Sequence, residues 1–417
     1  MSTVHVIGAG LAGLSAALQA SGTPGLQVVV HEAGPAAGGR CRTFHDRKLD
    51  IEIDNGNHLL LSGNREAARF LEVIGAGDKL DGPGTACFPF VDIKTGERWT
   101  VRPSAGRIPW WILAASRRVP ETRLRDYTDL LSLVRVSDDR PVSEVVPRGE
   151  LYCRLVEPLA IAALNTSPQQ GLARLMGAVM RETLMRGGKA CVPLYPKAGL
   201  SGALVDPAVA YLQRRGVSVR FSQRIAGLSI ANNRVTALNL PEDTIPVGSG
   251  DSVVLAVPAW VATDLLPGLT VPDSHEAIVN IHFRFDPPAG GALAEAGFIG
   301  ILGGTAEWLF HKQRHLPVTV SAANRLVDTD PDVIAATVWA DICAALGISD
   351  PLPPFRVIKE KRATFAATAE QERRRPQART HLANLALAGD WTATGLPATI
   401  EGAIRSGRTA ASVLLAA

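Results

Sequence analysis

Apolar and polar positions alternate in a recognisable order over the first 32 residues. Residues 4–7 are a β-branched apolar run that predicts a buried strand, and residues 11–20 are rich in alanine and leucine, which predicts a helix. A second apolar run, residues 28–31, ends at Glu32. The order of strand, glycine turn, helix, strand and acid predicts a dinucleotide-binding βαβ unit.

The glycine turn of this unit predicts where a dinucleotide binds. Gly8 allows the tight turn, Gly10 lets the backbone approach a pyrophosphate, and Gly13 lets helix and strand pack closely. The helix N-terminus presents free N–H groups to the phosphates, and the carboxylate of Glu32 is placed to accept hydrogen bonds from a ribose. The expected cofactor-binding positions here are Gly8, Gly10, Leu11, Ala12, Gly13 and Glu32.

Apolar positions recur at helical spacing in several later segments. The predicted helices cover residues 64–74, 152–164, 167–186, 204–215 and 330–346. Gly75 and Gly347 follow two of them as C-terminal stops, and Ser167, Pro168 and Gln170 predict a capping box at the start of a third.

Shorter apolar runs bounded by turn residues predict strands. They cover residues 51–58 (ending in a polar turn), 217–220, 225–231, 235–240, 252–258, 278–285, 298–302, 318–322, 355–364 and 385–388. Asn232 and Asn233 predict a hairpin turn between two of these strands.

Composition excludes several classes of protein. With 46% hydrophobic and 20% charged residues the chain is typical of a globular protein, and a formal net charge of +3 does not indicate a nucleic-acid partner. The five cysteines are scattered, so we expect reduced thiols and neither a metal site nor a disulfide framework. No apolar run reaches the roughly 18 residues of a spanning helix. The first strand begins at once, so we expect no signal peptide and a cytoplasmic protein.

Two further motifs lie near Arg40 and near the other end of the chain. Gly39 and Arg40 follow the first acid by a few residues, where a turn and a guanidinium are available to the phosphates of a larger cofactor. Far away in sequence, an apolar run leads into Gly389 and Asp390, and a last helix is expected to begin after Thr399. These two motifs must meet in space if they serve one cofactor.

Together these motifs resemble the superfamily of flavin-containing amine oxidases and phytoene desaturases. Three short motifs resemble those of the hydroxysqualene dehydroxylase family within this superfamily, namely Asp54-Asn55-Gly56-x-His58, Asn165-Thr166 and Leu194-Tyr195-Pro196. The resemblance covers the whole chain. It implies bound FAD and the reductive removal of a hydroxyl group from hydroxysqualene, a thirty-carbon isoprenoid of squalene and hopanoid synthesis, with electrons from an external donor. The FAD is expected to be non-covalent, because no cysteine follows Cys343 to form the thioether of some amine oxidases.

The resemblance also implies roles for individual residues. Asp390 is expected at the ribityl and pyrophosphate region, and the segment 54–58 beside the isoalloxazine ring. The last helix is expected to point its N-terminus at the flavin N1–C2 edge, where it stabilises the negative charge of reduced flavin. The expected FAD-binding positions beyond the first motif are Gly39, Arg40, Asn55, Gly56, Ile225, Gly389, Asp390, Thr399, Ile400 and Glu401. The expected catalytic residues are His58, as the acid or its hydrogen-bonding partner, with Asp54 and Tyr195.

The implied fold is α/β, with a Rossmann-like FAD-binding domain and an interleaved α+β substrate domain of antiparallel sheet and helices. The FAD-binding domain is expected over residues 1–80, 191–265 and 371–417. A helical region facing substrate and membrane is expected over residues 81–190, and the sheet and helix of the substrate domain over residues 266–370.

Three other activities are alternatives. A carotenoid-type desaturase would oxidise its substrate instead of reducing it. An amine oxidase would need a lysine near flavin N5 and an aromatic cage; none of the eight lysines falls in residues 278–285, and Trp391 offers only one wall. A flavin-free escort protein that binds prenylated partners is disfavoured, because both flavin motifs are intact.

A pair of tryptophans in the predicted helical region fits two interpretations equally. Trp110 and Trp111 lie among aliphatic residues and arginines, namely Arg107, Arg117, Arg118, Arg123 and Arg125. Aromatic residues beside a basic rim are typical of a surface that contacts a membrane. The alternative is a core segment with a solvated charged face. The first interpretation predicts a peripheral protein at the inner membrane; the oligomeric state is not predicted.

Overall fold

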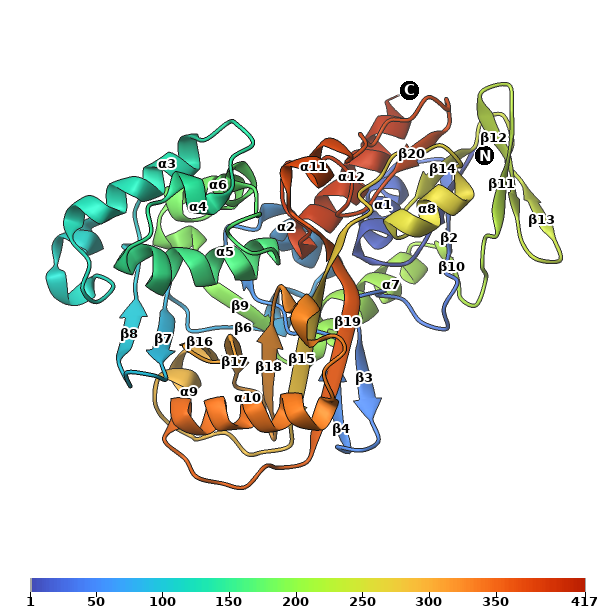
Figure 1. Cartoon of the computed structure of the whole chain (residues 1–417). Helices are drawn as coiled ribbons and strands as arrows, with labels where there is room; N and C mark the ends of the chain where they lie inside the picture. The colour runs from blue at the N-terminus through green and yellow to red at the C-terminus, as the bar shows by residue number, and fades with distance from the viewer. Residues whose placement is uncertain (1, 417) are drawn as a thin grey trace.

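The computed structural model describes residues 2–416 and contains a five-stranded parallel sheet in the order β10-β2-β1-β14-β20 (Figure 1). Its strands are β1 Ser2–Ile7, β2 Leu26–His31, β10 Ser218–Arg220, β14 Ser252–Leu255 and β20 Leu385–Leu387. Val4 pairs with Val28 on one side and Ser252 on the other. Segments 1–80, 191–265 and 371–417 therefore all contribute strands to this sheet.

Apolar side chains cover both faces of the parallel sheet, as parallel sheets require. One face packs against the helices α1 (Leu11–Ser21), α2 (Arg65–Ile74), α7 (Asp206–Arg214) and α12 (Ile400–Leu415). The other face packs against α8 (Ala259–Leu265) and the antiparallel strands β11 (Gly227–Ala231), β12 (Arg234–Asn239) and β13 (Thr244–Pro246). Asn232 and Asn233 have positive φ angles of 50° and 59° in the turn between β11 and β12, so the predicted hairpin is present.

A second sheet of seven strands has the order β19-β15-β18-β17-β16-β7-β8. Its strands are β7 Phe88–Asp92, β8 Arg98–Val101, β15 His275–Phe283, β16 Phe298–Leu302, β17 Trp308–Phe310, β18 Leu316–Val320 and β19 Phe355–Phe365. The pair β16 and β7 is parallel, so this sheet is mixed and not purely antiparallel as expected. Its apolar core includes α10 (Pro331–Leu346) and α9 (Ala292–Ala296), and Figure 1 shows α10 lying across the sheet.

The segment 81–190 is less helical than the sequence interpretation has it. It supplies β7 and β8 to the seven-stranded sheet, joined by a turn in which Gly96 has a φ angle of 76°. Its α-helices are α3 (Asp129–Arg135), α4 (Val142–Val145), α5 (Glu157–Leu164), which continues a π-helical turn, and α6 (Ala173–Glu182). Its apolar residues pack against Phe298, Trp308 and Phe310 of the second sheet.

The predicted helix over residues 167–186 begins later than expected. Its N-cap is Leu172, because Ser167 instead closes a turn whose carbonyl accepts the N–H groups of Gln170 and Gly171. Other predicted ends match closely: α2 ends at the left-handed Gly75, α10 ends at the left-handed Gly347, and α12 begins after Thr399.

Short strands connect the two sheets. β3 (Thr43–Asp46) pairs with β4 (Ile51–Asp54), and β9 (Pro193–Pro196) pairs with both β5 (Leu60–Leu61) and β6 (Leu80–Asp81). The long antiparallel strands β15 and β19 extend upward beyond the other strands of the seven-stranded sheet in Figure 1, toward α8 and α11 (Ala369–Arg373). Among residues 2–416, no helix is long and apolar enough to cross a membrane.

Candidate flavin and substrate site

The glycine turn after β1 leaves open space at one position and close contacts at two others. A Cβ added to Gly8 would lie 2.5 Å from the carbonyl oxygen of Ala256. A Cβ added to Gly13 would lie 1.9 Å from the carbonyl oxygen of Gly8. Neither position therefore has room for a side chain. At Gly10 an added Cβ would have nothing within 4 Å. A phosphate group can therefore approach the backbone at Gly10 and the first-turn N–H groups of Leu11 and Ala12.

Glu32 lies beside this turn at the end of β2. Its carboxylate accepts hydrogen bonds from the backbone N–H groups of Ala9 (2.8 Å) and Gly34 (2.7 Å). The N–H of Gln223 donates to the carbonyl of Glu32, which brings the loop containing Ile225 to the same edge of the sheet. Ile225 itself precedes β11, so the predicted strand starts two residues later than expected.

Arg40 joins the two distant motifs. Gly38 forms an isolated parallel bridge with Gly10, which places Gly39 and Arg40 beside the glycine turn. The Arg40 guanidinium donates to the Asp390 carboxylate at 2.7 Å and to the carbonyl of Ala363. Burial acts to lower the pKa of Arg40, but the charge of Asp390 and its hydrogen bond outweigh burial, and the pKa is raised overall. Arg40 therefore stays charged. The two motifs therefore meet in space.

Arg375 is a buried residue beside the second motif that the sequence does not point to. Its side chain is fully buried and donates to the carbonyl groups of Asp390, Thr392 and Leu396, and to the hydroxyl of Thr394. Arg375 therefore holds the loop that starts at Gly389 in one shape. No local sequence signal distinguishes it from the two arginines that precede it.

The last helix places its N-terminus next to this loop. Thr399 caps α12 by accepting a hydrogen bond from the N–H of Gly402 at 3.0 Å, and Ile400 is buried below it. The carboxylate of Glu401 points elsewhere, since it accepts hydrogen bonds from the N–H groups of Glu66 (3.1 Å) and Ala67 (2.9 Å) at the start of α2. The Glu401 side chain is therefore engaged with α2, and the predicted place of Glu401 in the FAD site, at the N-terminus of α12, stays a prediction.

Asp54 is a buried carboxylate that is paired with a lysine. Its carboxylate is 2% exposed and pairs with Lys312 at 2.5 Å, and it also accepts hydrogen bonds from Thr43 Oγ1 (2.6 Å) and the N–H of Leu200 (2.8 Å). Burial acts to raise the pKa of Asp54, but Lys312 and these hydrogen bonds outweigh it and hold the pKa below its ordinary value. Asp54 therefore has no proton to donate near neutral pH, and its place in the catalytic site stays a prediction.

Lys312 lies outside residues 278–285, the strand in which the lysine of an amine oxidase is expected, so the sequence does not point to it. It follows β17 and reaches Asp54 across 258 residues of sequence. A lysine is therefore present behind the segment 54–58, but its ammonium group is engaged with a carboxylate.

Asn55 and Gly56 are held by the second sheet. Asn280 of β15 donates from its amide to the carbonyl of Asn55 at 3.3 Å, and the amide of Asn55 donates to Glu360 at 3.3 Å. An added Cβ at Gly56 would lie 3.3 Å from Asn280. The segment therefore lies against strands β15 and β19 with little space behind it.

His58 ends this segment with a defined tautomer. Its Nδ1 lies 3.0 Å from the carbonyl oxygen of Gly56, so Nδ1 carries the hydrogen and donates it. Burial lowers the pKa of His58; the Gly56 carbonyl and Asp54 act to raise it, and Arg40 and Lys312 add to the lowering. His58 is therefore neutral near neutral pH in the absence of further charge.

Tyr195 lies on β9 and packs against the second sheet. An added Cβ at Gly297 would overlap the Tyr195 ring, so this glycine is what allows the ring to lie there. Burial raises the pKa of Tyr195, and Asp81 adds to the rise, so its hydroxyl is protonated. β9 pairs with β5, two residues beyond His58, which places Tyr195 and His58 on adjoining segments.

Two buried histidines lie next to Lys312. The rings of His282 and His315 are 5.7 Å apart, and both nitrogens of His282 and Nε2 of His315 are buried without a hydrogen-bond partner among the described residues. Burial lowers the pKa of His282 to about 3 and that of His315 to about 4, and Lys312 contributes to both shifts. Both imidazoles are therefore neutral.

Comparison with known proteins identifies the family. A family model described as flavin containing amine oxidoreductase matches residues 11–415. Hydroxysqualene dehydroxylase of Sinorhizobium fredii (strain NBRC 101917 / NGR234) is 49% identical over 99% of this chain and 98% of its own length. The enzyme of the same name from Rhodopseudomonas palustris (strain ATCC BAA-98 / CGA009) is 48% identical over 100% of this chain and 99% of its own length. The chain belongs to the hydroxysqualene dehydroxylase family of flavin-containing amine oxidoreductases.

More distant similarities concern the full length of the chain and its fold. A 15-cis-phytoene desaturase of an Oncidium hybrid cultivar is 22% identical over 99% of this chain and 77% of its own length. A solved structure described as a putative protoporphyrinogen oxidase from Exiguobacterium sp. 255-15 superposes with a TM-score of 0.70 at 20% identity, covering 100% of this chain and 99% of that one. The predicted α/β fold class is confirmed.

The cofactor of this flavin-containing family is FAD, and the chain is an FAD-dependent oxidoreductase. The residues present fit FAD: the backbone at Gly10 is open to a phosphate, Arg40 supplies a cation, and the capped N-terminus of α12 faces the Gly389–Asp390 loop. The roles of the individual residues remain predictions.

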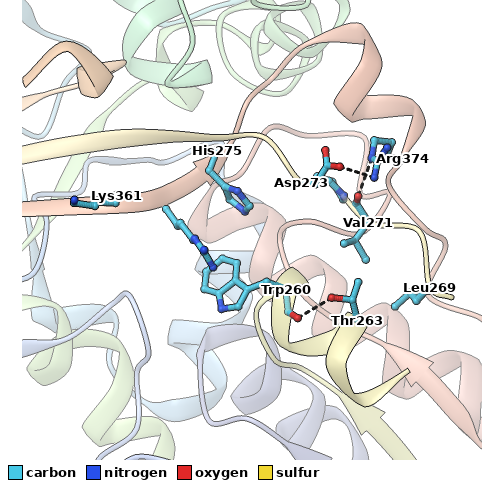
Figure 2. A pocket seen from close by; sticks show the side chains of 10 residues that line it. Trp260, Thr263, Leu269, Val271, Asp273, His275, Lys361 and Arg374 are labelled. Atoms are coloured by element: carbon cyan, nitrogen blue, oxygen red, sulfur yellow. Dashed lines mark hydrogen bonds and ion pairs between the residues drawn. The ribbon is translucent and has the colours of Figure 1, made fainter. Parts of the chain in front are cut away.

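A cavity of about 440 Å³ lies between α8 and the upper parts of β15 and β19 (Figure 2). Polar and charged side chains line much of it. Arg374 pairs with Asp273 at 2.7 Å, and the Arg362 guanidinium lies 4.8 Å from the centre of the Trp260 ring. Figure 2 shows His275 and Trp260 on one side and the Arg374–Asp273 pair on the other. The cavity therefore combines charged groups with the apolar side chains of Trp260, Leu269 and Val271.

Proposed function

We propose that this protein catalyses the reductive dehydroxylation of hydroxysqualene to squalene. The observation that carries the proposal is the 49% identity to a hydroxysqualene dehydroxylase over 99% of this chain. The geometry supports it, because the Arg40–Asp390 pair and the segment 54–58 lie together between the two sheets.

The chain's own residues would bind the cofactor and manage protons. When reduced, bound FAD supplies a hydride. Arg40 and the first turn of α1 are placed to hold the phosphates, and the positive end of α12 stabilises negative charge beside Gly389. His58 is our candidate for the group that protonates the departing hydroxyl. Apolar side chains of the 81–190 segment would line the path of the isoprenoid and exclude water.

The alternatives have less support. Trp391, the candidate wall of an amine cage, is 3% exposed and donates its indole N–H to the carbonyl of Val257, so it does not face a substrate pocket. A phytoene-type desaturase stays as the second candidate because of the full-length but distant similarity to phytoene desaturases. We further propose that FAD is held without a covalent bond, and that its electrons come from an external donor.

Product analysis separates these activities. Photoreduced protein is incubated with hydroxysqualene without oxygen, and oxidised protein is incubated separately with phytoene and with amines. We expect squalene, lighter than its substrate by one oxygen atom, in the first reaction only. Loss of two hydrogens from phytoene, or oxidation of an amine, with no squalene formed would overturn the proposal. Acid precipitation should leave all flavin in the supernatant; flavin in the pellet would contradict non-covalent binding.

We also propose that the segment around Trp110 docks on an anionic membrane surface. Ile108, Trp110 and Leu113 are 56%, 62% and 58% exposed, whereas Trp111 is 3% exposed and packs its ring against Tyr127. Trp111 is thus a core residue, and only Trp110 of the pair is on the surface. Exposed arginines flank these apolar residues in the sequence, namely Arg107, Arg117, Arg123 and Arg125. A water-insoluble substrate would be presented by the lipid phase to such a surface.

Vesicle binding tests the docking surface. Co-sedimentation with vesicles containing about a third anionic lipid should fall markedly for Trp110→Ser and for Arg107→Glu, since each basic residue near such a surface contributes about 1 kcal/mol. Val333, 56% exposed on α10, offers a matched control, and Val333→Ser should bind like the parent. Equal binding by all variants, or no preference for anionic lipid, would contradict the proposal.

A further inference from the structure

Two ion pairs lie near His58, and in each the cation is in direct contact with its carboxylate. The charged groups that act on the His58 ring are Asp54 of β4, Arg40 of the glycine-rich loop and Lys312 after β17. Lys312 pairs with Asp54 at 2.5 Å, and Arg40 pairs with Asp390 at 2.7 Å. The surroundings of His58 are therefore close to neutral overall.

The ring of His58 has one position left for a proton. Because Nδ1 donates its hydrogen to the carbonyl of Gly56 at 3.0 Å, Nε2 holds a lone pair. Protonation at Nε2 would leave the bond to Gly56 in place. His58 can therefore gain and lose a proton without moving.

Reduction of FAD brings a net negative charge into this neutral site. A helix N-terminus such as that of α12 offers only about half a positive charge. The two nearby cations, Arg40 and Lys312, are already engaged with carboxylates. A titratable group on the segment 54–58 itself can balance the charge, and His58 is that group, whereas the neutral His282 and His315 lie beside Lys312 on the second sheet.

We propose that His58 takes up a proton from solvent when the bound flavin is reduced, and gives it to the hydroxyl group that leaves the substrate. The proposal rests on the proposed function and on the placement of segment 54–58 beside the flavin ring. The balance is closed: the substrate C–O bond breaks, the hydroxyl takes the proton of His58 and leaves as water, and a hydride from reduced flavin forms the new C–H bond. Flavin returns to its oxidised form and His58 to its neutral form.

The electrostatics of the site agree with a proton that arrives only on reduction. Burial, Arg40 and Lys312 keep the pKa of His58 below its ordinary value, against the opposing effect of Asp54 and the Gly56 carbonyl. A negative charge within about 4–6 Å favours the charged form of an imidazole, so reduction acts in the opposite direction to burial. The acid would thus be loaded in the state of the enzyme that can also deliver the hydride.

The midpoint potential of the bound flavin, measured against pH without substrate, tests this coupling. For a two-electron couple each proton taken up changes the potential by about 30 mV per pH unit. Two-electron reduction to the anionic flavin takes one proton. The wild-type protein should therefore show about 60 mV per pH unit between the pKa values of His58 in the two redox states. His58→Gln, which keeps a donor for Gly56, should show about 30 mV per pH unit.

His275→Gln provides the matched control. His275 is also a partly buried histidine whose pKa is lowered by burial, then by Arg362 and less by Arg40, but it lies on the cavity of Figure 2, so this variant should keep the wild-type slope. Equal slopes for wild type and His58→Gln, or a loss of slope in His275→Gln alone, would overturn the proposal. Because no substrate is present, this result is independent of whether squalene is formed.

Discussion

Single side chains decide how the two flavin motifs are joined. Arg375 alone donates to three carbonyl groups and one hydroxyl in the loop after Gly389, and it lies 4.8 Å from the centre of the Phe365 ring. Arg40 ties that loop to the glycine turn through Asp390. The loop geometry therefore depends on two arginines whose partners are mostly backbone carbonyls, for which lysine is a poor replacement because it lacks the planar fork.

Replacement of His58 tests the proposed acid. His58→Ala should lower squalene formation by about 100-fold or more while FAD content stays that of wild type, because a positioned general acid contributes about 10²–10⁴-fold. Single-turnover kinetics of photoreduced protein measures the effect. His381, an exposed histidine, gives the control His381→Ala, which should turn over normally. Unchanged turnover in His58→Ala would remove this residue from the mechanism.

Removal of Lys312 should destabilise the fold by leaving a buried charge unpaired. Lys312→Met strands the Asp54 carboxylate, and breaking a buried pair in this way costs about 3–5 kcal/mol of unfolding free energy. The double variant Lys312→Met/Asp54→Asn should recover part of this loss, because no charge is left uncompensated. Urea unfolding of the three proteins measures both changes; a stable single variant would show that the pair does not anchor the segment 54–58.

At the scale of elements, helix ends are where distant parts of the chain are joined. Glu401, in the first turn of α12, satisfies two N–H groups at the start of α2. Asn165, at the left-handed C-cap of α5, accepts the N–H of Ala322 (2.7 Å) and donates to Thr364 (2.9 Å). Residues of the family motifs therefore also join α12 to α2 and α5 to the seven-stranded sheet.

Loss of the Glu401 carboxylate should loosen α2. Glu401→Ala removes the acceptor of two first-turn N–H groups, and the loss of an N-cap acceptor costs about 0.5–2 kcal/mol. Glu401→Gln keeps one oxygen acceptor and should cost less. Hydrogen exchange of the Glu66 and Ala67 amides measures the effect directly. Unchanged exchange in Glu401→Ala would contradict the assignment.

The sequence predicts elements well where the signal is local, and site residues poorly where the partner is distant. Gly347 and Thr399 mark helix ends through their own backbone or hydroxyl group, and both predictions are confirmed. The predicted start of α6 is wrong, because Ser167 does not form a capping box. Its carbonyl group accepts hydrogen bonds in a turn, and the helix begins after Leu172. Lys312 and Arg375 were missed, because their importance comes from contacts that only the folded chain forms.

At the scale of the whole molecule, buried neutral histidines predict how stability depends on pH. Burial lowers the pKa of His31 and His315 to about 4 and that of His282 to about 3, and it also lowers that of His5. These four histidines therefore bind fewer protons in the folded protein than in the unfolded chain below about pH 6.5, and they outnumber Glu307, whose pKa burial raises to about 7 and which acts in the opposite direction. The stability that depends on the neutral histidines is fully present above about pH 6.5 and is lost as the pH falls toward 4.

A urea unfolding series between pH 4 and pH 8 measures this dependence. We expect an unfolding free energy that is nearly level from pH 7 to 8 and falls steeply below pH 6, by up to about 1.4 kcal/mol per pH unit for each histidine concerned. His282→Phe should flatten the curve, because it removes one of these groups. A level curve down to pH 4 would contradict the buried neutral state of these side chains.

The order of strands in the parallel sheet has a consequence for biosynthesis. β1 and α1 are synthesised before their partners β14, β20 and α12, which come more than 240 residues later, and Gly407 packs against the Ala12 carbonyl. A nascent chain must therefore carry an incomplete apolar surface while the residues between these elements are made. Cofactor loading has to wait until α12 leaves the ribosome, so this protein should depend on chaperones that shield the earlier segments and should acquire its colour only after α12 is made.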